Sequence, residues 1–425
     1  SCTEQEVEEF LDVSKDGTEE EEEYELQEEN TTTGDSSVDL ELLASTYALT
    51  SVTASNFNQL YNYLQDGNSY DITLSASFTA TSSIYCNETY TWLSNENSYG
   101  LGPIGKTSWN PSKFVNLKLN NHTLNLASYF IDVSFTSITI SGPGKIVGSG
   151  ANTTLKYYDG TQNDAAHYAV IRYGHGSILN ITDSAILECI GTNGANAIYG
   201  FHRNAMGLNI TNGATVCNTG VGRAIFGGGG GSTQVIIDNA TVYSSCESFT
   251  YTTSFGVLRN NSYAIYTPYH DIIIRNGAKV YNKASGAKAY AVLSDSGNIT
   301  IEGETTEVYC GNSLTSPTNA TSSAIRCGKG TVTITSGKVG SITDYKYAKK
   351  APGFKASIIV GGDAQKKAIV YNFRATGKIS TGSTNFLVEL TLNENGEVTL
   401  NNQNAYTNLK VNTNPGSILN ISLNT

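Results

Sequence analysis

The sequence predicts an all-β protein and, within that class, a parallel β-helix, in which each turn of the chain stacks on the one before it. Three observations predict this fold. Short alternating strands end in Asn/Gly-type corners, the same strand and corner types recur about one coil apart, and helix-forming residues are scarce outside the N-terminal arm. One coil cannot bury its own inward side chains, so a repeat of this kind stacks on its neighbours.

The repeat consists of a strand, a corner rich in Asn, Asp, Ser and Gly, and a second strand that closes on an apolar residue. The closing residues lie 41, 29, 26, 38, 28 and 31 residues apart, which predicts coils of roughly 26–30 residues with insertions. A β-sandwich would not keep corner and strand types in step in this way. The segments begin at Ile138, Leu179, Leu208, Val235, Ile272, Ile299 and Val332 and close at Ile146, Leu187, Val216, Val242, Val280, Val308 and Val339. A small residue followed by a branched one marks each unit a second time, at Ala169-Val170, Ala197-Ile198, Ala224-Ile225, Ala264-Ile265, Ala291-Val292 and Ala324-Ile325.

Segments on either side of the repeat complete the organisation. An amphipathic helix is expected at 56–65, with Ser55 as its N-cap and Gly67 just beyond its end, and it would cap the N-terminal end of the solenoid. The segment after the repeat is strand-like and forms either terminal coils or a small β cap. We therefore divide the chain into an acidic arm (1–41), a linker with the capping helix (42–69), the β-helix (70–345) and a C-terminal part with a basic region (346–425).

Two stretches resemble a known superfamily. Residues 113–126 read Lys-Phe-Val-Asn-Leu-Lys-Leu-Asn-Asn-His-Thr-Leu-Asn-Leu, and residues 137–146 read Ser-Ile-Thr-Ile-Ser-Gly-Pro-Gly-Lys-Ile. Together they resemble the opening found in repetitive surface proteins of the pectate-lyase-like right-handed β-helix superfamily. The resemblance covers about residues 70–345 and implies a right-handed, single-stranded solenoid. It implies no single activity, because that superfamily includes lyases, hydrolases, phage tailspikes and non-catalytic adhesins.

Charge is distributed very unevenly along the chain. Residues 1–41 carry 17 carboxylates and one lysine, whereas residues 326–378 carry eleven basic and two acidic groups. Opposite charges at the two ends predict association between copies of the chain. The nearly neutral body between them gives no reason to expect nucleic acid as a partner. The residues assigned to this association are Glu19, Glu20, Glu21, Glu22, Glu23, Lys346, Lys349, Lys350, Lys366 and Lys367.

The search for catalytic residues ends without a set. Gly174-His175-Gly176 matches a segment of the polygalacturonase branch, but the chain has no Asp-Asp pair to accompany it. His167, His202 and His270 lie beside aromatic residues in insertions, and their spacing selects none of them as a general base. Asp183 and Asp238, with Asn212 and Asn276 between them, are interpreted as a polar ladder along one corner. We assign no catalytic residue and expect no cofactor, while a calcium site stays open.

Aromatic residues gather in the insertions between repeats. If they align on one face, they provide platforms for a polysaccharide, a cell-surface glycan or a protein. The alternative is that they cover the solenoid and each other. The residues assigned to binding are Tyr157, Tyr158, Tyr168, Tyr199, Phe201, Tyr251, Tyr266 and Tyr269.

Cysteine usage and the start of the sequence bear on location. Cys189 and Cys217 lie 28 residues apart, one coil, which predicts a disulfide between neighbouring coils, and Cys310 and Cys327 are candidates to clamp an insertion. Reduced core thiols are the alternative. The sequence begins at Ser1 and not at Met, so we expect a leader to have been removed. No run of 18 apolar residues predicts a membrane span. We expect a secreted or cell-surface protein.

These observations favour an extracellular surface β-helix that acts as an adhesin or as a structural subunit of a surface fibre. It would associate with copies of itself through its ends and bind glycans through its aromatic insertions. A polysaccharide lyase or glycoside hydrolase of the same superfamily is the alternative, and a phage tailspike is a further one.

Overall fold

The computed structural model describes most of the chain after the acidic arm. All structural statements below refer to these residues. They are 48–87, 110–150, 168–174, 176–200, 206–227, 234–246, 249–252, 258–267, 270–284, 289–294, 297–311, 313–315, 323–327, 330–344, 355–374, 387–401 and 409–422.

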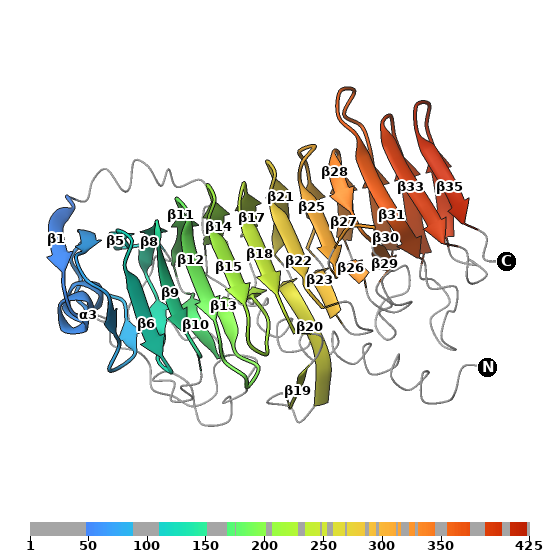
Figure 1. Cartoon of the computed structure of the whole chain (residues 1–425). Coiled ribbons are helices and arrows are strands. Elements are labelled where there is room, and N and C mark those ends of the chain that lie inside the picture. Colours follow the sequence, from blue (N-terminus) through green and yellow to red (C-terminus); the bar gives the residue numbers. More distant parts are fainter. Residues whose placement is uncertain are drawn as a thin grey trace, which may run out of the picture.

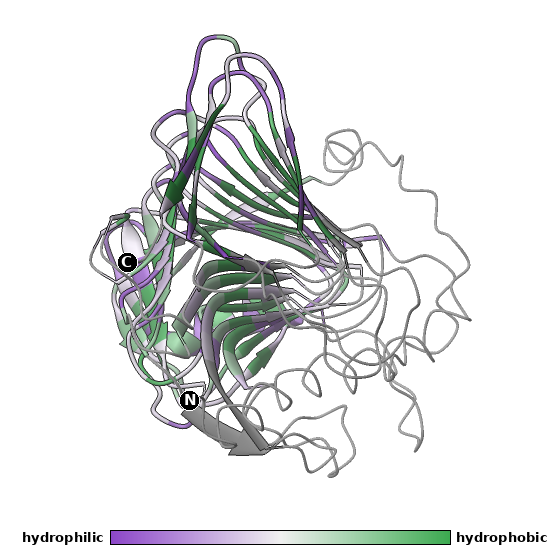
Figure 2. Cartoon of the chain, turned by 90° about the vertical axis from the view of Figure 1, so that its right-hand side faces the viewer, coloured by the Kyte–Doolittle hydropathy of each residue, from purple (hydrophilic) through white to green (hydrophobic). Residues whose placement is uncertain are grey.

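The described strands wind around a common axis as a right-handed parallel β-helix, with one short helix at its N-terminal end (Figure 1). Viewed along the stack, the coils overlie one another around an enclosed core (Figure 2). Sheet 1 has 13 parallel strands. They are β1 (Thr50–Ala54), β2 (Tyr70–Leu74), β5 (Lys113–Lys118), β8 (Thr136–Ser141), β11 (Ile178–Thr182), β14 (Gly207–Thr211), β17 (Gln234–Asp238), β21 (Asp271–Arg275), β24 (Ile299–Ile301), β27 (Gly330–Ile334), β30 (Lys355–Val360), β32 (Leu387–Leu392) and β34 (Leu409–Thr413).

The second and third strands of each coil form two further columns, which we call sheet 2 and sheet 3. Sheet 2 contains β3 (Phe78–Thr79), β6 (Thr123–Ala127), β9 (Gly144–Gly148), β12 (Ala185–Cys189), β15 (Thr215–Asn218), β18 (Thr241–Ser244), β22 (Lys279–Asn282), β25 (Glu307–Cys310), β28 (Gly337–Val339), β31 (Ala368–Arg374), β33 (Gly396–Asn401) and β35 (Ile418–Ser422). Sheet 3 contains β4 (Ile84–Tyr85), β7 (Ile131–Val133), β10 (Ala169–Tyr173), β13 (Asn196–Gly200), β16 (Ile225–Gly227), β20 (Leu258–Thr267), β23 (Ala289–Ser294), β26 (Ser323–Cys327) and β29 (Ile342–Asp344). The pairing of β19 (Phe249–Thr252) with β20 is antiparallel.

The register between coils confirms the repeat that the sequence predicts. Ile138 pairs with Leu179, Leu179 with Leu208, and the pairing continues through every predicted start to Val332. The closing residues from Ile146 to Val339 pair in the same way. One marker is displaced by a residue, because Ile171, and not Val170, pairs with Ile198.

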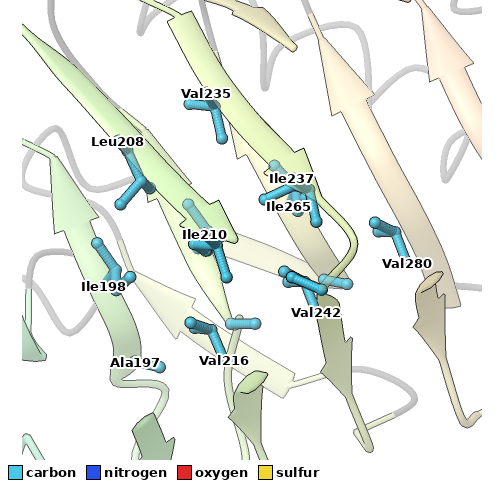
Figure 3. Close-up of a cluster of buried hydrophobic side chains, with 14 of the residues drawn as sticks. Ala197, Ile198, Leu208, Ile210, Val216, Val235, Ile237, Val242, Ile265 and Val280 are labelled. Atoms are coloured by element: carbon cyan, nitrogen blue, oxygen red, sulfur yellow. The ribbon is translucent and has the colours of Figure 1, made fainter. Parts of the chain in front are cut away.

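The core is a set of parallel columns of branched side chains that point toward the solenoid axis. Figure 3 shows part of it, where side chains of sheets 1, 2 and 3 meet. Leu208, Ile210, Val216 and Ile225, from three strands of one coil, are completely buried. Each is stacked on its register partner in the next coil, so burial is continuous along the axis.

The N-terminal end of the core is covered by α3 (Phe57–Gln65), as the amphipathic pattern predicts (Figure 1). Phe57, Leu60 and Leu64 are buried in the core cluster. The N-cap differs from the expected Ser55. It is Asn56, whose side chain accepts a hydrogen bond from the Gln59 N–H at 3.0 Å.

Lys113 on β5 ties this cap to the first coils. Its ammonium is buried and donates to the carbonyl oxygens of Tyr63 at 2.5 Å and Asp66 at 2.6 Å, and to Asp66 Oδ1 at 3.2 Å. These carbonyls belong to the last turn of α3, where a helix leaves its acceptors without internal partners. A cation is also favoured there by the helix dipole.

We expect Gly200→Ala to destabilise the fold. A Cβ built at Gly200 would lie 2.7–2.8 Å from the ring of Tyr173, its register partner, and Tyr173 is 1% exposed and has little room to move. Overpacking of this kind costs about 1–3 kcal/mol. Gly207→Ala is the matched control, because its Cβ would meet no atom closer than 4.0 Å. Urea unfolding measures both, and equal midpoints would contradict the packing assigned to Tyr173.

We expect Lys113→Met to loosen α3, because two buried carbonyl groups would lose their donor at a cost of about 2–4 kcal/mol. Hydrogen exchange should accelerate in the amides of α3 while those of β14 stay protected. Lys118→Met is the control, since Lys118 forms an exposed ion pair with Asp71 and its loss should cost less than about 1 kcal/mol. Unchanged exchange in α3 would show that the helix is held by its apolar face alone.

Candidate functional site

The predicted binding aromatics that fall within the described residues lie on or beside sheet 3. Tyr199 and Tyr266 lie on β13 and β20, and Tyr168 directly precedes β10. Their exposed fractions are only 4%, 5% and 7%. The structure describes the backbone of Tyr251 on β19, whereas its side chain lies outside the described residues, as do Tyr157, Tyr158, Phe201 and Tyr269.

Tyr199 and Tyr266 belong to one column on the outer side of sheet 3. Its members alternate along each strand with core residues such as Ile198 and Ile265. The Phe226 ring lies between them, with centroids 5.2 Å from Tyr199 and 5.0 Å from Tyr266. The column consists in order of Tyr85, Asp132, Arg172, Tyr199, Phe226, Tyr266, Leu293 and Arg326.

Arginines pack flat against these rings. The Arg172 guanidinium carbon lies 5.7 Å from the Tyr199 ring centroid, and that of Arg223 lies 4.5 Å from Phe226. Arg172, Arg223 and Phe226 are each 1% exposed. Guanidinium groups over aromatic faces are stabilising, most of all away from water. The column therefore packs as a covered layer outside the core, and its described rings face one another and the arginines.

The one close contact between opposite charges in this column joins Asp132 and Arg172. Asp132 Oδ2 lies 3.8 Å from Arg172 Nη1, and Ser134 Oγ donates to Asp132 Oδ1 at 3.0 Å. Burial raises the pKa of the Asp132 carboxyl to about 6, against the opposing effects of Arg172 and Ser134. A carboxyl group that titrates near neutrality beside a fixed cation is the arrangement that acid–base chemistry uses.

A second aromatic array lies on the outer face of sheet 2, and the sequence analysis missed it. Tyr243, Tyr281 and Tyr309 stack in register, with ring centroids 5.0 and 4.9 Å apart and interplanar angles of 8° and 3°. All three are half-buried, so the array remains partly open to solvent. We call these three residues the tyrosine ladder. Its signal was present in the sequence, since each of these tyrosines directly follows a closing valine of the repeat.

The predicted disulfide between Cys189 and Cys217 is wrong. Cys189 pairs in register with Asn218, and Cys217 pairs with Glu188, so the two thiols differ by one residue in register and face opposite sides of sheet 2. Both are free and buried. Burial raises the pKa of Cys189 to about 12 and that of Cys217 to about 11.

The Cys310–Cys327 bridge is not formed either, because Cys310 is a free buried thiol. Its Sγ faces the carbonyl oxygens of Ala289 at 3.6 Å and Ser323 at 3.5 Å. The position is one rung of a polar column inside sheet 2, where each side chain can bond the backbone as the chain turns toward sheet 3. Asn218, for example, donates to the carbonyls of Ala195 at 2.7 Å and Arg223 at 2.9 Å. The column consists of Cys189, Asn218, Ser244, Asn282 and Cys310.

The polar corner between sheets 1 and 2 exists, but one of its predicted members is displaced. Asp183, Asn212, Asn239 and Asn276 all have positive φ, between 49° and 56°, which Asn and Asp tolerate better than branched residues. Asp238 lies one residue earlier, at the end of β17, where it accepts from Arg275 Nε at 2.7 Å. These carboxylates are spent on hydrogen bonds within the surface.

Other predicted residues are dispersed. Lys366 and Lys367 are exposed between β30 and β31, whereas Glu19–Glu23, Lys346, Lys349 and Lys350 lie outside the described residues. His270 is buried, and His167, His175 and His202 also lie outside them. Across the described ranges, no three His, Cys, Asp or Glu side chains come together in a group suited to hold a metal ion. No helix in that part of the chain has the length and apolar character to cross a membrane.

Comparison with known proteins gives no relative, because no family model, no curated protein and no solved structure matches this chain.

We expect the stability of the protein to depend on the ionisation of Asp132. The pKa of this carboxyl is raised from 3.8 to about 6 in the folded state, so its contribution to stability is complete below pH 3.8 and is lost as pH rises through about 6. Asp132→Asn cannot ionise. Its Tm relative to the wild type should therefore increase between pH 4.5 and pH 7.5, as measured by calorimetry.

Ser134→Ala serves as the companion variant, because it removes a hydrogen bond that lowers the pKa of Asp132. Carbon-13 NMR of the carboxyl should show that pKa rising further. A Tm difference between Asp132→Asn and wild type that stays constant with pH would contradict the assignment.

Proposed function

We propose that this chain is an extracellular surface β-helix, an adhesin or a structural subunit of a surface fibre, related to non-catalytic members of the pectate-lyase-like superfamily. The observation that carries the proposal is the organisation of its accessible side chains into ladders. The tyrosine ladder repeats one group at the coil spacing, and on sheet 1 Asn209 Nδ2 donates to Asn180 Oδ1, one coil away, at 2.8 Å. Repeating rigid surfaces suit recognition of a repeating partner or assembly into a larger structure.

Self-association through the ends of the chain is part of this proposal. Lys366 and Lys367 provide exposed positive charge near the C-terminal end of the stack, and residues 1–41 carry the opposite charge. Charge steers such contacts and makes them sensitive to salt. Glycan binding by the aromatic residues of the insertions remains part of the proposal as well.

Polysaccharide cleavage is a second candidate because of Asp132 alone. Its buried carboxyl, with a pKa raised to about 6 beside Arg172, has the character of a general acid. Against this candidate, a glycoside hydrolase uses two carboxyl groups and a lyase needs a base near the scissile bond. The described residues supply no second titratable side chain within reach of Asp132 other than its arginine partner.

The two functions are separated by incubating the full chain with acidic polysaccharides and measuring new reducing ends and unsaturated products. We expect no cleavage above that of a heat-inactivated sample. Cleavage that is lost in Asp132→Asn would replace the binding function with an enzymatic one.

Association through the ends is tested by light scattering on the full chain in low and high salt. The weight-average mass should fall in high salt, and a variant carrying both Lys366→Glu and Lys367→Glu should lose about tenfold in affinity. Lys118→Glu, on sheet 1, provides a control of equal charge change. Association that is unaffected by the paired lysine change would reject the role of the basic end.

A further inference from the structure

The outer face of sheet 2 carries, beside the tyrosine ladder, a second column with alternating charge. Thr241, Lys279, Glu307 and Lys338 follow one another in register on β18, β22, β25 and β28. They lie two residues before the tyrosines along each strand and so point to the same side. Lys279 is exposed and Glu307 is half-buried.

Lys279 and Glu307 occupy neighbouring rungs, as do Tyr281 and Tyr309, and this order makes the face complementary to itself. Consider a second copy rotated by 180° about an axis that lies in the face, parallel to the strands, between β22 and β25. The rotation reverses the order of the coils and keeps the position along each strand. Lys279 then faces Glu307 of the second copy, and Tyr281 faces Tyr309, twice each by symmetry.

The side chains have the size that this contact needs. Sheets pack face to face about 10 Å apart, and Tyr, Lys and Glu side chains on both faces fill such a gap. Among the described residues, neither Lys279 nor Glu307 takes part in an ion pair within its own chain, so their charges are available to a partner. In Figure 1 the strands β18, β22, β25 and β28 run side by side along this face.

An axis between β25 and β28 would pair Glu307 with Lys338 instead, and it fits less well. It would place Tyr309 opposite Gly340, the next position of the ladder. A Cβ built at Gly340 would lie 3.2 Å from the Leu314 carbonyl oxygen, so the chain already covers that rung. The first axis places tyrosine on tyrosine and is the one the geometry favours.

We propose that sheet 2 is a lateral interface between two copies of this chain, centred on Lys279, Tyr281, Glu307 and Tyr309. The inference rests on the proposed self-association and adds to it a surface on the side of the solenoid that does not use the ends. The contact is isologous and therefore closes as a dimer, whereas contacts between the ends propagate. The two together would join solenoids both side by side and lengthwise.

Sedimentation velocity on the full chain tests the interface through charge reversal. Lys279→Glu and Glu307→Lys should each raise the dimer Kd about tenfold or more, because like charges then face each other at two symmetric positions. An equimolar mixture of the two variants should form a heterodimer with a Kd within about threefold of the wild type. Each variant also places like charges together within its own chain, and mixing cannot repair that, so recovery reports contact between copies.

Lys338→Glu is the matched control, since the favoured axis places Lys338 opposite Thr241 and its reversal should leave the Kd within about threefold of the wild type. Circular dichroism and Tm confirm that each variant is folded. Overturning results would be a wild type that stays monomeric at 100 µM, single variants that dimerise normally, or a mixture no tighter than its components.

Replacing Glu19–Glu23 by Gln in the full chain separates the two modes of association. A dimer that survives this change and is lost in Lys279→Glu supports the lateral interface whether or not the arm associates. Loss of all association through the glutamines alone would overturn the lateral interface and leave the arm-mediated function standing.

Discussion

Ile210 on β14 lies between Ile181 on β11 and Ile237 on β17, and contacts of this kind between register partners recur along the whole solenoid. A slip of one residue would turn every such side chain to the outside, because side chains alternate with a period of two along a strand. The burial of branched residues therefore sets the register of each coil against the next. Strand pairing, corner geometry and the order of side chains on the outer faces all follow from that register.

The same constraint explains why the chain is rich in Asn and Gly. A coil must turn sharply between sheets, and each turn leaves backbone groups that no strand can pair. Asn212 supplies the left-handed conformation at one corner, whereas Asn218 turns inward at the next and donates to two backbone carbonyls. Both residues are polar and short, but one solves a problem of backbone geometry and the other a problem of buried hydrogen bonds.

The fold could be predicted from the sequence because register shows itself as periodicity. Positions such as Leu208 and Val235 align along the chain without knowledge of the structure, and the structure pairs them. Face assignment needs more precision than period. A spacing of 28 residues between Cys189 and Cys217 is one coil, but neighbouring coils differ by a residue or two in length, and a single residue decides whether two thiols meet or point apart.

The functional surface was harder to predict for a related reason. Aromatic residues in the insertions attracted attention because they cluster, yet those that the structure describes, such as Tyr199, are packed against arginines and other rings. The tyrosine ladder is made of residues from inside the repeat, which carry no unusual local composition. Only their common position after a closing valine sets them apart, and that position matters once the register is known.

A side chain on an outer face of a solenoid has two fixed neighbours, one coil above and one below, so a column of like residues has no preferred register against a partner. A copy could slide along three equivalent tyrosines with little change in contact. Opposite charges on adjacent rungs remove that freedom, because any shift by one coil brings Lys279 away from Glu307 and places another side chain opposite it. The pair thus gives a flat, repetitive surface one alignment with a copy of itself, while the tyrosines supply most of the area that such a contact would bury.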